Sequence, residues 1–200
     1  MKLKIITITL GLFLLSVAQA APIVYFDFDG DGLQDTSTSV ALGTSFTAGL
    51  YVTNVDSLEG GLLGWGSEIN FNNTQLSANS YTIDSQWFIP GNGNNINNAG
   101  SSVELFAARL SPGLTGTIKL ADINFDTLGI GSSMLTMSEL FSGNLDFIGF
   151  GGATGYNYDA DILFNNADAM INVSAVPLPP AILLFISGLL GLVGIRKLRR

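Results

Sequence analysis

Short runs of alternating apolar and polar residues, separated by clusters of Gly, Asn, Asp and Ser, fill the chain between residues 21 and 175. In the clearest run, Ser45–Val52, the apolar side chains Phe46, Ala48, Leu50 and Val52 share one face. A period of two is typical of a strand with one buried face. The same pattern occurs at Ile23–Phe26, Gly64–Phe71, Tyr81–Asp84, Val103–Leu110, Thr115–Phe125, Met134–Leu140, Leu145–Phe150 and Ala169–Val173. About eight or nine short strands and little helical periodicity predict an all-β fold, a two-sheet β-sandwich.

One strand changes phase partway along. Ile118 and Leu120 point to one face of Thr115–Phe125, whereas Ile123 and Phe125 have the opposite parity. An extra residue in the strand restores a common apolar face. We therefore expect a β-bulge near residues 121 and 122.

The first twenty residues differ from the strand-rich body. Lys2 and Lys4 precede the apolar run Ile5–Val17, and Ala18-Gln-Ala20 supplies small residues at the end. This order predicts a signal peptide over residues 1–20, removed by signal peptidase on export. The mature body then comprises residues 21–175, which is one domain in length.

The last stretch of the chain has three parts in a fixed order. Three prolines within residues 177–180 precede an uncharged run, Leu178–Ile195, which has the minimum length for a membrane span. A basic cap of Arg196, Lys197, Arg199 and Arg200 follows. By the positive-inside rule, a helix over about 181–195 would sit in the inner membrane with this cap in the cytoplasm.

These residues resemble the PEP-CTERM sorting signal of Gram-negative bacteria. The motif positions are Val176, Pro177, Leu178 and Pro179, with Leu178 where the family name has Glu. The resemblance implies recognition by an exosortase, a membrane transpeptidase that cuts near the proline motif. The body would then leave the inner membrane for the cell surface or extracellular matrix, where exopolysaccharide is a potential partner.

Charge and composition narrow the chemistry of the body. All 16 acidic residues lie between Asp27 and Asp168, and Arg109 and Lys119 are the only cations outside the two ends, so the formal charge of the body is 2 − 16 = −14. Such a surface repels nucleic acid and favours cations. With no Cys or His, disulfides, Ser-His-Asp or Cys-His catalysis and zinc sites with N/S ligands are excluded.

One acidic segment has the spacing of a calcium loop. Asp27, Asp29, Asp31 and Asp35 would supply carboxylates, and Leu33 its carbonyl oxygen, as hard ligands for Ca²⁺. Gly32 permits the sharp turn that brings them together. The twelfth position is a threonine and no flanking helices are predicted, so a full EF-hand is not expected. A solvated acidic turn is the alternative.

Two further groups of residues are candidates for carbohydrate chemistry. Trp65 and Trp87 would offer a sugar-stacking platform if exposed, or belong to the core if not. Asp159 and Asp161 would serve a polysaccharide hydrolase if they flanked a cleft. Alternating carboxylates on one strand bind water or a cation more often, so we expect no enzyme here.

The body also resembles the cohesin-like sandwich, a jelly-roll fold related to some carbohydrate-binding modules. The resemblance rests on residues 40–46, 50–55, 68–72 with Leu76, 116–125 and 131–135, with Asn72 where Asp is commoner. We expect an exported, non-catalytic protein with a binding or structural role in exopolysaccharide or biofilm. The alternatives are the hydrolase and a cohesin-like module that binds a protein.

Overall fold

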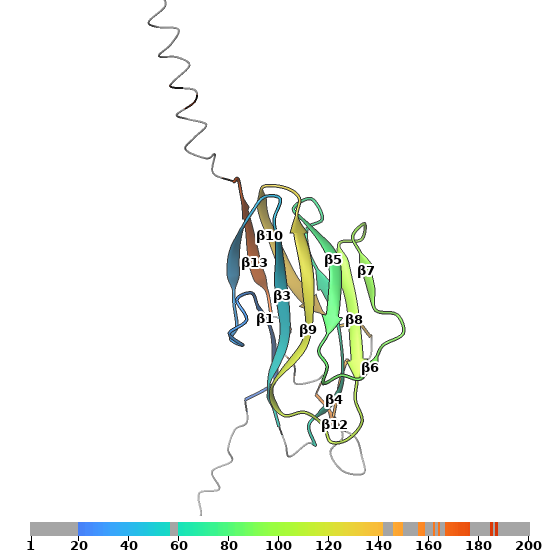
Figure 1. Cartoon of the computed structure of the whole chain (residues 1–200). Helices are drawn as coiled ribbons and strands as arrows, with labels where there is room; N and C mark the ends of the chain where they lie inside the picture. Colours follow the sequence, from blue (N-terminus) through green and yellow to red (C-terminus); the bar gives the residue numbers. More distant parts are fainter. Residues whose placement is uncertain are drawn as a thin grey trace, which may run out of the picture.

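The computed structural model describes residues 20–56, 60–141, 146–149, 156–158, 162, 164, 167–176, 185 and 187. Within them, two β-sheets pack face to face along one long axis (Figure 1). The first sheet has four strands in the order β1-β3-β9-β5, all antiparallel. Their bounds are β1 Ile23–Asp27, β3 Ser45–Val55, β9 Gly116–Thr127 and β5 Leu76–Ile83.

The second sheet is centred on β4, which pairs with β8 along one edge and with β10 and β11 in succession along the other. The sheet continues from β10 through β13 to β2, and β13 and β2 form a parallel pair. Short strands β6 and β7 pair with the far edge of β8. The bounds are β2 Ser37–Ala41, β4 Leu62–Asn70, β6 Ile89–Pro90, β7 Asn95–Asn97, β8 Ser102–Ala108, β10 Gly131–Ser138, β11 Phe147–Gly149, β12 Tyr156–Asn157 and β13 Ala169–Ser174.

The predicted two-sheet sandwich is confirmed, and each predicted run contains or overlaps a strand. The largest difference lies in β5, which begins five residues before the predicted start at Tyr81. The pattern missed β2, β6, β7 and β12. β2, Ser37–Ala41, has no buried residue and consists mainly of Ser and Thr, so it has no apolar alternation to detect.

The expected bulge lies close to its predicted place. Leu50 of β3 pairs with Ala121 and Tyr51 pairs with Lys119, so Leu120 is the extra residue in β9. Leu120 and Ala121 are both fully buried although they are neighbours in sequence. The bulge thereby places Ile118 on the same inner face as Ile123.

The core lies between the two inner faces. Phe26, Leu50 and Phe125 fill it from the first sheet, and Leu105 and Phe147 from the second, all with 0% exposure. Aromatic rings in and around this core contact one another in pairs, with ring centroids 5.4 to 6.3 Å apart. Because the core spans both sheets, neither outer face needs apolar side chains for folding.

Several predictions fall on residues that the structure does not describe. These are the signal peptide apart from Ala20, the pair Asp159 and Asp161, and the tail beyond Val176 apart from Phe185 and Ser187. Among the described residues, no helix is long and apolar enough to cross a membrane. The tail therefore stays a prediction from the sequence.

Replacing Phe125 by alanine should lower the free energy of unfolding by about 3–5 kcal/mol, because a buried ring is lost and a cavity remains. The ring of Phe125 is fully buried and lies 5.5 Å from that of Phe46 and 5.4 Å from that of Phe71. Urea denaturation measures the change. The control, Leu110→Ala, removes a side chain that is 65% exposed and should alter stability by less than about 0.5 kcal/mol. Equal losses in the two variants would contradict this assignment of the core.

Candidate functional site

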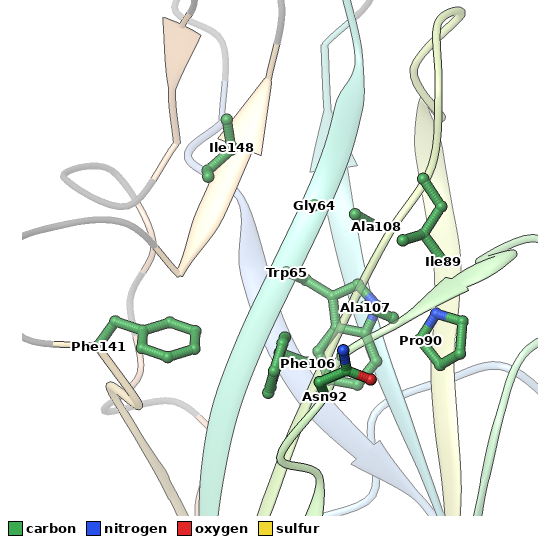
Figure 2. Close-up of a pocket in the computed structure, with 11 residues that line it drawn as sticks. Gly64, Trp65, Ile89, Pro90, Asn92, Phe106, Ala107, Ala108, Phe141 and Ile148 are labelled. Carbon is green, nitrogen blue, oxygen red and sulfur yellow. The ribbon is translucent and has the colours of Figure 1, made fainter.

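An apolar groove of about 350 Å³ lies on the outer face of the second sheet. Its floor is formed by Gly64 of β4 and by Phe106 and Ala108 of β8, which point away from the core. Figure 2 shows Ile148 and Phe141 on one side of this floor and the β6 residues on the other. The outward-facing residues of three neighbouring strands, β4, β8 and β11, therefore form a concave apolar surface on the side of the sheet away from the core.

The groove is deepest where two small residues of its floor, Gly64 and Ala108, lie between larger walls. A Cβ atom built on Gly64 would meet only ordinary contacts, 3.8 Å from the Cβ of Ala108 and 4.0 Å from the Cβ of Ile148. The pairing partner of Gly64 in β8 is Ala108. A larger side chain at Gly64 would thus fit the backbone but fill the groove.

One wall is held in place by a buried carboxylate. Asp146, 1% exposed, accepts hydrogen bonds from the backbone N–H groups of Leu140 and Phe141, each at 2.9 Å. The Phe141 ring packs edge to face on Phe106, with centroids 5.4 Å apart. Gly66 lies beneath, where an added Cβ would come within 3.1 Å of Phe141 and of Asp146. These contacts fix the wall before any ligand binds.

The opposite wall is equally well supported. Ile89 and Pro90 form β6 and pair with Ala108 and Ala107. The next residue, Gly91, donates a backbone hydrogen bond to the Phe106 carbonyl at 3.0 Å and lies flat on that ring, which leaves no room for a Cβ. The wall is apolar and partly exposed, since Ile89 is 43% exposed and Ile148, across the groove, 41%.

Two carboxylates stand on the same sheet face beyond the groove. Glu68 of β4 and Glu104 of β8 are directly opposite each other in the register, and both are half-buried. Like charges in directly opposed positions destabilise a sheet. Glu68 is four positions after Gly64 on β4, and four residue steps along a strand span about 14 Å. The face therefore combines an apolar groove with an acidic pair that a cation would stabilise.

The predicted sugar-stacking residues are buried in the core. Trp65 and Trp87 are 2% and 3% exposed and contact each other edge to face at 6.3 Å. The indole Nε1 of Trp87 donates to the backbone oxygen of Lys119 at 2.9 Å. Both rings therefore belong to the core, the alternative that the sequence left open, rather than to an exposed stacking platform, and Trp65 also contributes to the lining of the groove. Trp65 faces inward because it shares the parity of Ser67 and Ile69 on β4.

The structure brings three of the four predicted calcium-loop carboxylates together. Oxygen atoms of Asp27, Asp29 and Asp35 lie within 4.8 Å of one another. Asp27 is 2% exposed, and its carboxylate accepts backbone hydrogen bonds from Asp29 at 3.1 Å, Gly30 at 2.7 Å and Gly32 at 2.9 Å. Both glycines have φ near +80°, which favours glycine. The loop is therefore wound around the Asp27 side chain.

The fourth predicted carboxylate, that of Asp31, is not part of this group. It accepts a hydrogen bond from the backbone N–H of Leu33 at 2.8 Å, and the Leu33 carbonyl as a ligand stays a prediction. Tyr25 donates its hydroxyl to the Gly32 carbonyl at 2.7 Å and so ties the loop to β1. Burial, assisted by the charges of Tyr51 and the nearby aspartates, raises the pKa of Tyr25, which keeps this hydroxyl protonated.

No known protein family and no curated protein matches this sequence. Solved structures of cohesins are similar in fold. The seventh ScaB type I cohesin of Pseudobacteroides cellulosolvens aligns over 80% of this chain and 97% of its own, with 14% identity and a TM-score of 0.55. The cohesin module of a family 33 glycoside hydrolase from Clostridium perfringens aligns over 78% and 99%, with 12% identity and a TM-score of 0.54.

A third cohesin was solved with a protein partner. The sixth cohesin of scaffoldin B from Acetivibrio cellulolyticus, in complex with a mutant Cel5 dockerin, aligns over 77% of this chain and 98% of its own, with 11% identity and a TM-score of 0.52. The described body therefore has a cohesin-like fold, as the sequence resemblance predicted. At these identities the likeness defines the fold and assigns no partner.

Proposed function

We propose that this protein is a non-catalytic protein-binding module, and that the apolar groove with the neighbouring Glu68–Glu104 pair is its binding surface. The observation that supports this most strongly is the groove itself, which is apolar, partly exposed and held open by Asp146 and Gly91. Preformed concave apolar surfaces are typical of binding sites. The cohesin solved with a dockerin supports a protein as the class of ligand.

The partner should combine apolar anchors with a basic residue. A groove of about 350 Å³ accommodates a small number of side chains, and the acidic pair lies about 14 Å further along β4. On a partner helix this separation corresponds to about nine residues. Because the body carries a charge of −14, basic partners would also be attracted from a distance.

Filling the groove should abolish partner binding. Proteins of the source cell would be passed over immobilised wild-type protein, and the retained partner would be identified and its affinity measured by calorimetry. Gly64→Leu should weaken binding by at least about tenfold, because an apolar anchor loses its pocket. Replacing Glu68 and Glu104 together by glutamine should weaken binding less and flatten its dependence on salt.

The matched control is Leu110→Ser, which removes a 65% exposed apolar side chain that does not line the groove and should leave affinity unchanged. A partner that binds wild type and Gly64→Leu equally would contradict the proposed surface. Failure of the wild-type protein to retain any partner would contradict the proposed function. Asp159 and Asp161, on which the hydrolase alternative rests, lie outside the described residues, so that alternative stays a prediction from the sequence.

The tail is proposed as the sorting signal that delivers this module. Val176, the first motif residue, is 57% exposed and lies two residues after the end of β13, so the motif begins at the surface of the body. Export, transient residence in the inner membrane and release to the surface or matrix follow from the two ends of the sequence. Any role in biofilm would then act through the protein-binding groove, because the predicted sugar-stacking residues are buried.

Mass spectrometry of the mature protein should find that residues 196–200 are absent when the cells contain an exosortase. The expected cut lies near Pro177-Leu178-Pro179, because that motif separates the body from the uncharged run. Cells that lack the exosortase serve as the control and should retain the basic cap. An intact C-terminus in both strains would contradict the sorting proposal.

Calcium binding at Asp27, Asp29 and Asp35 is the second proposal for the body. These residues fit a hard cation because their carboxylate oxygens already converge within 4.8 Å. Titration should show binding in the weak range, about 10⁻⁴–10⁻³ M, with a higher melting temperature that a chelator reverses. Asp29→Asn should remove the effect and Glu139→Gln should retain it. No heat and no chelator-sensitive melting in the wild type would contradict the proposal.

A further inference from the structure

One end of the sandwich carries no charged residue in its connecting loops. These loops, which we call the β13 end, are residues 42–44, 71–75, 98–101 and 128–130, together with 175–176 where the chain leaves β13. They lie at one end because Ser174 pairs with Ala41, Gly131 with Val173, Asn70 with Ser102 and Leu76 with Thr127. In a body with a charge of −14, an end without acidic loops is unusual.

Apolar side chains project from this uncharged end. Leu128 and Ile130, at the turn between β9 and β10, are 57% and 60% exposed, and Val176 is 57% exposed. Figure 1 shows this turn at the same end of the molecule as the last residues of β13. Exposed apolar residues grouped around one exit point indicate an interaction surface.

The turn cannot bury these side chains by folding back. The backbone N–H of Leu128 donates to the Gln75 carbonyl at 2.7 Å. A Cβ on Gly129 would come within 2.5 Å of the Thr74 carbonyl, so the loop already lies directly on its neighbour. Leu128 and Ile130 are therefore held outward by the packing of the backbone.

The chain continues from this end toward its most apolar segment. Four residues, Pro177 to Pro180, separate Val176 from Ala181, where the predicted membrane helix starts. Four fully extended residues span at most about 14 Å, and a proline-rich segment reaches about 12 Å. If residues 181–195 lie in a bilayer, the β13 end is held within about 15 Å of its surface, roughly two Debye lengths at physiological salt.

We propose that the β13 end rests on the membrane surface before the tail is cut, with Leu128 and Ile130 inserted at the lipid interface. This inference rests on the proposed membrane anchoring of the tail. An acidic body is repelled by anionic lipid. The loops of the β13 end carry no charge, and the carboxylate of Asp126, at the end of β9 beside them, accepts a hydrogen bond from the Ser45 hydroxyl, so turning this end toward the bilayer reduces the repulsion. The strands then stand away from the membrane, and the groove on the sheet face stays open to a partner (Figures 1 and 2).

The absence of cysteine permits a direct test, because one introduced thiol can be labelled alone. Protein expressed from the full sequence in cells without an exosortase would carry Ile130→Cys with an environment-sensitive fluorophore. It would be reconstituted into vesicles of phosphatidylethanolamine and phosphatidylglycerol. The label should shift to the blue on reconstitution and lose emission when the lipids carry nitroxide groups.

The matched control is Leu110→Cys, at the opposite end of the sandwich and 65% exposed, whose label should keep its aqueous spectrum. Adding Leu128→Asp to Ile130→Cys should remove the blue shift while the protein still floats with the vesicles. Flotation with identical spectra at positions 130 and 110 would overturn the inference and leave the anchor intact. Loss of flotation would overturn the anchor, and the inference with it.

Discussion

Packing between two sheet faces is the interaction on which this molecule depends. No cysteine is available for a disulfide, so the free energy of burying side chains such as Phe26, Phe125 and Phe147 must hold the sheets together. Because strand side chains alternate, burial of one face leaves every second residue on the outside. The outer faces are thus free to carry chemistry that the core does not use.

The groove illustrates how that freedom is used. On β4, Gly64, Gly66 and Glu68 alternate with residues that face the core, and their partners on β8 are Ala108, Phe106 and Glu104. Small residues, an aromatic ring and an acidic pair thus follow one another along a single face. The Ser138 hydroxyl donates a hydrogen bond to Glu68 at 3.5 Å, but the two opposed carboxylates repel each other, and a cationic partner would relieve that repulsion.

The sequence predicted what depends on local periodicity and failed where the answer depends on contacts between distant segments. Ser45–Val52 and the bulge in β9 followed from alternation alone, and both were confirmed. The groove could not be predicted from alternation, because Gly64, Phe106 and Ile148 come from three separated segments. Glycines at outward positions of β4 were the only local signal. For Trp65, residue type left exposed and core positions open, and its parity with Ile69 on β4 places it in the core.

The two cations of the body, Lys119 and Arg109, both make contacts within the molecule. Lys119 pairs with Asp122 at 2.8 Å and lies 5.8 Å from the centre of the Tyr51 ring, and Arg109 lies 6.0 Å from that of Phe88. Both cations are therefore engaged within the molecule, although such partly exposed contacts are weak. Neither contacts Glu68 or Glu104 in these interactions. The acidic pair on the sheet face is therefore balanced by solvent ions or by a basic partner. The loops of the β13 end carry no charge, with Asp126 of β9 beside them, and can approach lipid.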